Sequence, residues 1–167
     1  MTETQANLDP STFGFFLVAV VALPLALANL LEKGGPITTF FIVIGMLIFF
    51  VGMWAWKCNS NFGFTVFGLV GAAVFLTGYG MGYWENISFA AVFAFATVWY
   101  VLIGGGKNLT LILIVTSLLF LFVGLSSGDL VGGDYWHWLI GIDSLILFLL
   151  SFYMGCSCAV PEKFKPF

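Results

Sequence analysis

The sequence predicts an all-α integral membrane protein, a bundle of six transmembrane helices with both termini in the cytoplasm. Of its 167 residues, 61% are hydrophobic and only 8% are charged, whereas a soluble domain carries roughly a quarter charged residues. So few charges cannot coat a soluble surface, and lipid is therefore expected to cover most of the outside. Six apolar stretches, each close to the roughly 20 residues that a span requires, follow one another along the chain.

The helices are expected where these apolar stretches are bounded by Gly, Pro, Asn or charged residues. The predicted spans are 13–31, 37–56, 62–83, 86–103, 109–125 and 135–154. The first ends at EKGGP, the second at KCNSN and the fourth at GGGKN. Trp84 and Glu85 separate the third from the fourth, and a Gly- and Asp-rich loop over 126–134 precedes the sixth. Residues 1–12 and 159–167 are then cytoplasmic tails that flank a transmembrane domain over 13–158.

The lysines determine the orientation of the bundle. An even number of spans places both termini on one side of the membrane, together with Lys57, Lys107, Lys163 and Lys165, whereas Lys33 falls on the other side. Positive charge in short loops favours the cytoplasmic face. Both termini are therefore predicted to be cytoplasmic.

Charge and residue content exclude several classes of function. The chain has one His, no Arg and no close pair of carboxylates, so it lacks the residues for a catalytic triad, a glycosidase pair or a His-rich metal site. We expect no enzyme activity, no cofactor and no bound metal. A net charge of −3 offers no basic surface for nucleic acid. The three cysteines, Cys58, Cys156 and Cys158, are expected to be reduced thiols near the membrane surface.

Asp143 is the one acidic residue inside a predicted span. It lies about 10 Å along the sixth helix from Trp136, a depth at which an ionised carboxylate is costly. The side chain is expected to be protonated, hydrogen-bonded or in contact with water. Two interpretations stay open: a proton-linked group or polar step in a permeation path, or a carboxyl capped by neighbouring hydroxyls such as that of Ser144.

Three polar residues at helix ends are candidate solute contacts. Asn61 and Thr65 lie at the start of the third helix, and Asn29 lies one turn before the end of the first. The first and third helices both start on the predicted cytoplasmic side, and two helix N-termini around one axis would bind a small anion without Arg. Ordinary helix capping explains the same residues.

The segments 9–15 (DPSTFGF) and 61–67 (NFGFTVF) open the first and third helices. The first resembles the Asn-Pro-Ala-Pro-Leu-Gly-Leu signature of the succinate/acetate permease family, also called the acetate uptake transporters. The second resembles that family's Phe-Gly-Leu-Thr-Ala-Phe stretch at the start of helix three. The Gly-Gly-Lys turn that ends at Lys107 also falls where the family has it. Asp9 and Ser11-Thr12 depart from the first signature, in place of Asn and Ala-Pro.

This resemblance implies a hexamer of six-helix protomers, each with a pore that passes acetate or a similar small monocarboxylate, often coupled to protons. The family's apolar constriction consists of a Phe, a Tyr and a Leu from helices one, three and five. By position these correspond to Val18, Val70 and Leu118, so only the Leu matches. Valines in place of two aromatic residues would widen or reshape the constriction.

Together these observations predict a channel or proton-coupled transporter for small monocarboxylates in the plasma membrane, the inner membrane of the cell. Its partners would be the solute, membrane lipid and further copies of the chain. A channel for a small neutral solute, such as urea, a short amide, ammonia or water, needs no anion site and is the first alternative. The second is a membrane scaffold subunit whose polar intramembrane residues only pack.

Overall fold

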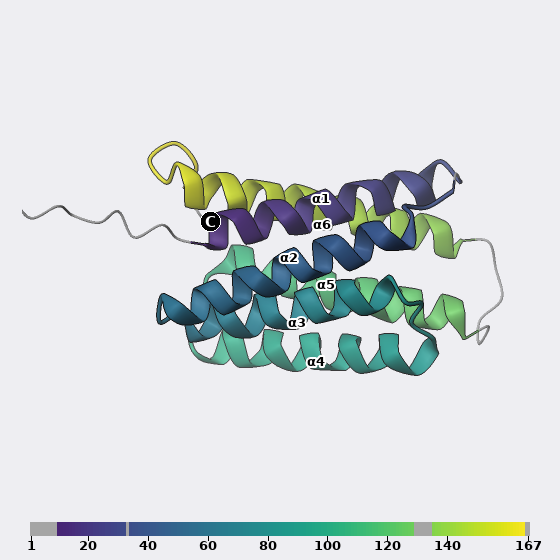
Figure 1. Ribbon diagram of the computed structural model, residues 1–167, viewed down its shortest axis with the longest axis horizontal. Helices are drawn as coiled ribbons and strands as arrows, with labels where there is room; N and C mark the ends of the chain where they lie inside the picture. Colours follow the sequence, from purple (N-terminus) through teal and green to yellow (C-terminus); the bar gives the residue numbers. More distant parts are fainter. Residues whose placement is uncertain (1–9, 33, 129–134, 166–167) are drawn as a thin grey trace, which may run out of the picture.

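The computed structural model describes residues 10–32, 34–128 and 135–165, and all regular structure within them is helical. The six helices are α1 (Ser11–Leu30), α2 (Thr38–Lys57), α3 (Asn61–Thr77), α4 (Tyr83–Leu102), α5 (Lys107–Ser127) and α6 (Trp136–Ala159). The all-helical bundle predicted from the sequence is thus confirmed (Figure 1). Asp9, Lys33, most of the N-terminal tail, most of the α5–α6 loop (129–134) and residues 166–167 lie outside the described residues.

Five of the six helices, all except α3, are long and apolar enough to cross a membrane. The chain is therefore a multi-pass membrane protein. α3 has 17 residues, which at about 1.5 Å per residue is shorter than a hydrocarbon core of about 30 Å. The predicted third helix ran on to residue 83. In the structure α3 ends at Thr77, since the chain turns through Gly80, whose φ of +83° suits a residue without a side chain.

The helices associate chiefly as three pairs, α2 with α3, α4 with α5, and α6 with α1, while α5–α6 and α1–α2 contacts join the pairs. We call the end of the bundle where α1 begins and α6 ends the terminal end, and the opposite end the distal end. The α2–α3 and α4–α5 connections also lie at the terminal end, on the left of Figure 1. One end of each helix pair therefore lies at the terminal end.

Glycines bring the backbones of α2 and α3 close together. A Cβ on Gly71 of α3 would lie 2.8 Å from the Cα of Phe49, and one on Gly52 of α2 would lie 2.9 Å from the backbone nitrogen of Gly68. Small residues at an interface permit this approach, which is how helices commonly associate in lipid. The pair α2–α3 thus packs backbone to backbone.

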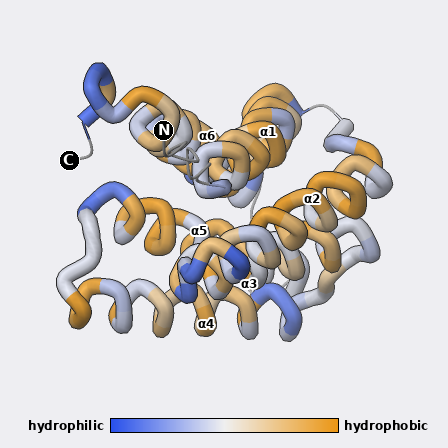
Figure 2. Tube along the Cα trace, turned by 60° about the vertical axis from the view of Figure 1, so that its left-hand side comes forward, coloured by the Kyte–Doolittle hydropathy of each residue, from blue (hydrophilic) through white to orange (hydrophobic). Residues whose placement is uncertain are grey.

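The exterior of the bundle is as apolar as its interior. The large side chains of Phe50, Phe95, Trp99 and Leu102 are all more than 60% exposed. Figure 2 shows hydrophobic residues along the helices and hydrophilic residues mainly at helix ends and connections. This distribution is the one that a lipid environment requires.

Candidate functional site

A cavity of about 160 Å³ opens at the terminal end, and we call it the vestibule. It receives side chains from α1, α3, α5 and α6 and from the turn before α3. Its lining residues are Ser11, Phe15, Ser60, Phe62, Gly63, Val66, Phe67, Leu109, Met154 and Cys158. None of these described residues is charged. The vestibule therefore offers hydroxyls, a thiol and apolar surface to a small solute.

Helix starts converge on the vestibule. Ser11 is the first residue of α1, Ser60 caps α3, and Leu109 lies in the first turn of α5. The Oγ of Ser60 accepts a hydrogen bond from the Gly63 N–H at 3.1 Å, the usual arrangement of a helix N-cap. Each helix start carries backbone N–H groups without intrahelical acceptors and the positive end of the helix dipole. The convergence favours a small anion weakly, without a fixed cation.

Three contacts hold the helices around the vestibule. The Nδ2–H of buried Asn108 on α5 donates to the Met154 sulfur on α6 at 3.9 Å. On the other side, the ring of Phe62 stacks on Tyr100 with centroids 4.4 Å apart, and the Tyr100 hydroxyl accepts from the Gly106 N–H at 3.1 Å. The α4–α5 connection is thereby fixed beside the start of α3.

The vestibule ends on a pair of aromatic rings. Phe15 of α1 and Phe67 of α3 meet edge to face, with ring centroids 5.2 Å apart and an interplanar angle of 69°. Both belong to the apolar core, at 4% and 2% exposure. Neither ring is among the site residues predicted from the sequence.

Asn61 and Thr65, two of the predicted solute contacts, do not line the vestibule. Both are exposed and border a different cavity, an open groove of about 680 Å³ between α3, α4 and α5. The Thr65 hydroxyl donates to the Asn61 carbonyl at 3.0 Å. At the start of α3, Ser60 is the polar side chain that reaches the vestibule.

Asn29, the third predicted contact, lies at the distal end. Its Oδ1 is 3.4 Å from the Nδ1 of His137, and its Nδ2–H donates to the Leu25 carbonyl at 2.8 Å. Asn29, His137 and Glu32 line a distal cavity of about 470 Å³. The structure therefore places Asn29 at the opposite end of the bundle from Asn61 and Thr65.

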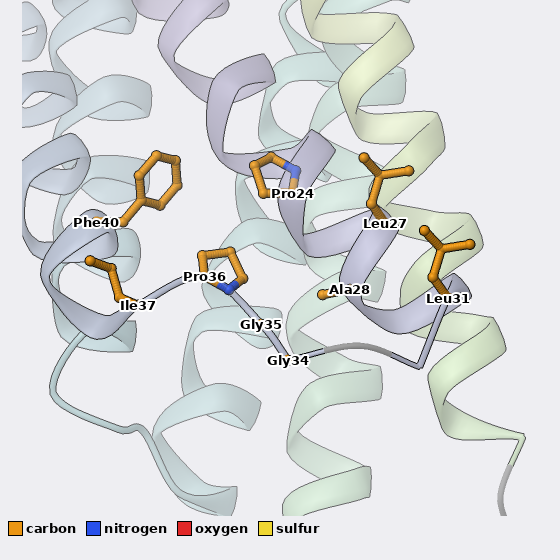
Figure 3. Close-up of a pocket in the computed structure, with 9 residues that line it drawn as sticks. All are labelled: Pro24, Leu27, Ala28, Leu31, Gly34, Gly35, Pro36, Ile37 and Phe40. Atoms are coloured by element: carbon orange, nitrogen blue, oxygen red, sulfur yellow. The ribbon is translucent and has the colours of Figure 1, made fainter.

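A second distal cavity, of about 450 Å³, lies between the last turns of α1 and the start of α2. Figure 3 shows Pro24, Leu27 and Leu31 on one side and Pro36, Ile37 and Phe40 on the other. Every residue that lines it is apolar. It provides no polar side chain for a carboxylate, so we do not include it in the candidate site.

The three predicted constriction residues differ in their surroundings. Val18 and Val70 are 7% and 8% exposed and belong to the same apolar core, whereas Leu118 is 37% exposed and lies outside that core. The next residue, Leu119, is buried in the core. The role of the three as a constriction stays a prediction.

Helix α6 carries buried polar side chains through the bundle. Asp143 is 6% exposed, Ser144 and Ser151 are completely buried, and the Asp143 Oδ2 and both hydroxyls have no hydrogen-bond partner within the described part of the chain. Thr116, by contrast, donates to the carbonyl four residues earlier. A buried polar group left unpaired costs about 1–3 kcal/mol. Each of these three side chains would therefore gain from a hydrogen bond to water or to a polar solute.

A solved structure shares this fold over almost the whole chain. It is described as the bacterial acetate channel SatP, and the likeness has a TM-score of 0.76, covers 95% of each chain and has 17% sequence identity. The chain has the fold of an acetate channel. A comparison with protein-family models finds no match, and a comparison with curated proteins finds none at a significant level.

The likeness to SatP extends over all six helices, because so little of either chain is left uncovered. At this level of identity it concerns the path of the backbone. The side chains of the vestibule, the core and α6 are those of this chain and have to be interpreted from their own chemistry.

Proposed function

We propose that this chain is a membrane channel or proton-coupled transporter for acetate or similar small monocarboxylates, and a distant member of the succinate/acetate permease family. The vestibule carries this proposal, because the starts of α1, α3 and α5 converge on it and bring hydroxyl groups and helix dipoles to one small cavity. The SatP fold supports the same solute class.

The proposed path runs along the bundle from the vestibule to the distal cavity. Val18 and Val70 are the apolar passage next to the vestibule, and Asn29 is a polar contact at the distal mouth. We retain Leu118 as a third constriction residue by resemblance, and Asn61 and Thr65 as solute contacts at the groove beside α3. An apolar passage penalises a bare carboxylate, so acetate is expected to bind weakly and to cross partly dehydrated or as the neutral acid.

Asp143 is the proposed proton-linked group. It is the acidic residue among the buried polar side chains of α6, and its Oδ2 has no partner within the described residues. In this proposal the carboxyl exchanges a proton with water or with the solute, and Ser144 and Ser151 supply hydroxyls along the same helix. Transport coupled to protons would use this group.

The membrane setting of the proposal follows from the resemblance and from the lysines. We place the protein in the plasma membrane with the terminal end in the cytoplasm, where Lys57, Lys107, Lys163 and Lys165 lie. We further propose a homo-oligomer, a hexamer, in which each protomer has its own path.

A channel for a neutral solute is the second candidate, and one observation favours it. The vestibule lining has no charged side chain among the described residues, and a negative charge at Asp143 would repel an anion. Urea or a short amide would use the hydroxyls of the vestibule and of α6 equally well.

Uptake into proteoliposomes tests these proposals. Purified protein is reconstituted, and initial uptake of labelled acetate and labelled urea is measured with and without a pH gradient, against liposomes without protein. We expect acetate uptake above the protein-free background that rises when the outside is acidic. Uptake of urea alone would favour the neutral-solute channel. Uptake of neither solute would contradict both transport proposals and leave the membrane scaffold subunit as the remaining alternative. Acetate uptake that ignores the pH gradient would contradict proton coupling.

A further inference from the structure

The vestibule has a polar mouth and an apolar inner wall. Ser11 and Ser60 lie at the helix starts, whereas Phe15 is about one turn further along α1 and Phe67 about two turns along α3 from the cap. Leu109, in the first turn of α5, borders the cavity from a third helix, and all three residues are buried in the core. A solute that moves inward from the hydroxyls therefore passes this leucine and meets the two rings.

The lining of the cavity does not extend past the rings. Val18 and Val70 lie three residues beyond Phe15 and Phe67 on the same two helices, so each valine shares a helix face with its aromatic neighbour. Neither valine borders the vestibule. The ring pair consequently separates the vestibule from the deeper core that contains both valines.

The packing around the pair holds Phe67 on one side. Gly14 precedes Phe15, and a Cβ at Gly14 would overlap the Phe67 ring. The rings meet edge to face, a favourable arrangement for two aromatic side chains. They offer no donor to a carboxylate, and a hydrophobic constriction of this kind blocks a passage by excluding water.

We propose that the Phe15–Phe67 ring pair, together with Leu109, is the gate that closes the vestibule and limits the size of the solute that passes. This inference rests on the proposed function, since a gate needs a solute to pass it. It places the narrowest point one helical turn closer to the terminal end than Val18 and Val70. A solute crosses when a ring rotates away from its partner.

Removal of one ring tests the size limit. We expect Phe67→Ala and Phe15→Ala to raise the ratio of butyrate to acetate uptake in proteoliposomes by at least about tenfold. Butyrate has two methylene groups more than acetate, and a hydrophobic pocket discriminates by about tenfold or more for one of them. Phe67→Leu keeps apolar bulk without the ring and is expected to raise the ratio less. Phe67→Leu replaces Phe67→Ala in the test if the alanine variant fails to fold.

Phe16→Ala is the matched control. Phe16 is the residue next to Phe15, but its ring packs on Phe152 of α6 with centroids 5.5 Å apart, and it does not border the vestibule. We expect it to leave the butyrate-to-acetate ratio unchanged. An unchanged ratio in both ring variants and Phe67→Leu, in protein that carries acetate, would overturn the gate.

Thiol labelling tests closure independently of any solute. The native cysteines, one of which lines the vestibule, are replaced by serine, and Val18→Cys or Ser11→Cys is introduced. Reaction with a membrane-impermeant thiol reagent is followed in proteoliposomes, with reagent on both sides. We expect Ser11→Cys to react rapidly whether or not Phe67→Ala is present. Val18→Cys is expected to react slowly on its own and faster when Phe67→Ala is added.

The two measurements separate the failure of the gate from the failure of the proposed function. Equal labelling of Val18→Cys with and without Phe67→Ala would overturn the gate whatever the protein transports. If the unmodified protein carries no acetate while labelling still depends on Phe67, the solute assignment fails and the closure of the vestibule by the rings stands.

Discussion

The ring of Phe67 on α3 occupies the space beside Gly14 on α1 where a side chain would otherwise lie. Helices that are distant in the sequence are thereby brought together at the inner wall of the vestibule. The residue without a side chain and the residue with a large one form a single packing unit. A substitution at either residue should therefore change the packing of the other.

Gly14→Ala is expected to lower the free energy of unfolding by about 1–3 kcal/mol, because the added methyl group displaces a buried ring. The second substitution Phe67→Leu should restore part of that loss, so the two effects should be non-additive. Thermal unfolding in detergent measures all three variants. Gly68→Ala, where a Cβ meets open space, is the control. Strict additivity of the two substitutions would contradict the packing described here.

Ser60→Ala should weaken the start of α3. The hydroxyl caps the Gly63 N–H at 3.1 Å, and loss of such a cap costs about 1 kcal/mol. We also expect slower acetate uptake, since the same hydroxyl lines the vestibule. Ser88→Ala, which removes an exposed hydroxyl bonded within α4, should change neither quantity. Normal uptake by Ser60→Ala in a destabilised protein would limit Ser60 to capping.

Val70→Trp should block the proposed path, because a large ring at a buried position of α3 fills the passage beyond the vestibule. Acetate uptake is expected to fall to the level of protein-free liposomes. Val92→Trp places the same side chain on the exposed surface of α4 and should leave uptake intact. Unchanged uptake in Val70→Trp would remove Val70 from the path.

Leu118 and Leu119 form a matched pair on α5. Only Leu119 belongs to the buried core, so Leu119→Ala should lower the free energy of unfolding by about 2–5 kcal/mol. Leu118→Ala, at the proposed constriction, should change acetate uptake with a smaller loss of stability. Acetate uptake rates and thermal unfolding of the two variants show which leucine affects transport and which affects stability. A large effect on uptake from Leu118→Ala, with none from Leu119→Ala, would support the constriction implied by the resemblance.

Asp143→Asn should abolish the dependence of acetate uptake on the pH gradient while keeping passive flux, because an amide retains hydrogen bonding but carries no exchangeable acid. Uptake at equal and unequal pH across the membrane measures this effect. Glu85→Gln, an exposed position at the start of α4, is expected to retain the gradient response. Persistence of the response in Asp143→Asn would exclude Asp143 as the proton-linked group.

Much of the fold could be predicted from the sequence, because Gly, Pro and charged residues mark the helix ends clearly. Helix α3 was the main error, since the run around Gly78 and Gly80 is apolar enough to read as a continued span. The site was harder to predict. α3 is apolar on every face, so no periodic pattern indicates which side enters the bundle.

The polar residues at the start of α3 show why the site was hard to predict. Asn61 and Thr65 are as polar as Ser60, and only the packing of α3 against its neighbours turns Ser60 toward the vestibule and the other two toward the groove. Phe15 and Phe67 were likewise hidden, in a chain with 20 phenylalanines. Ser144 and Ser151 could have been predicted from the sequence, because a spacing of seven residues places both on one face of a helix.

The most direct test of acetate transport by this protein is the initial rate of labelled acetate uptake by the purified, reconstituted protein. We expect a rate well above that of protein-free liposomes, and a return to that background in Val70→Trp. A rate equal to background for the unmodified protein, in vesicles shown to contain folded protein, would contradict the proposed function.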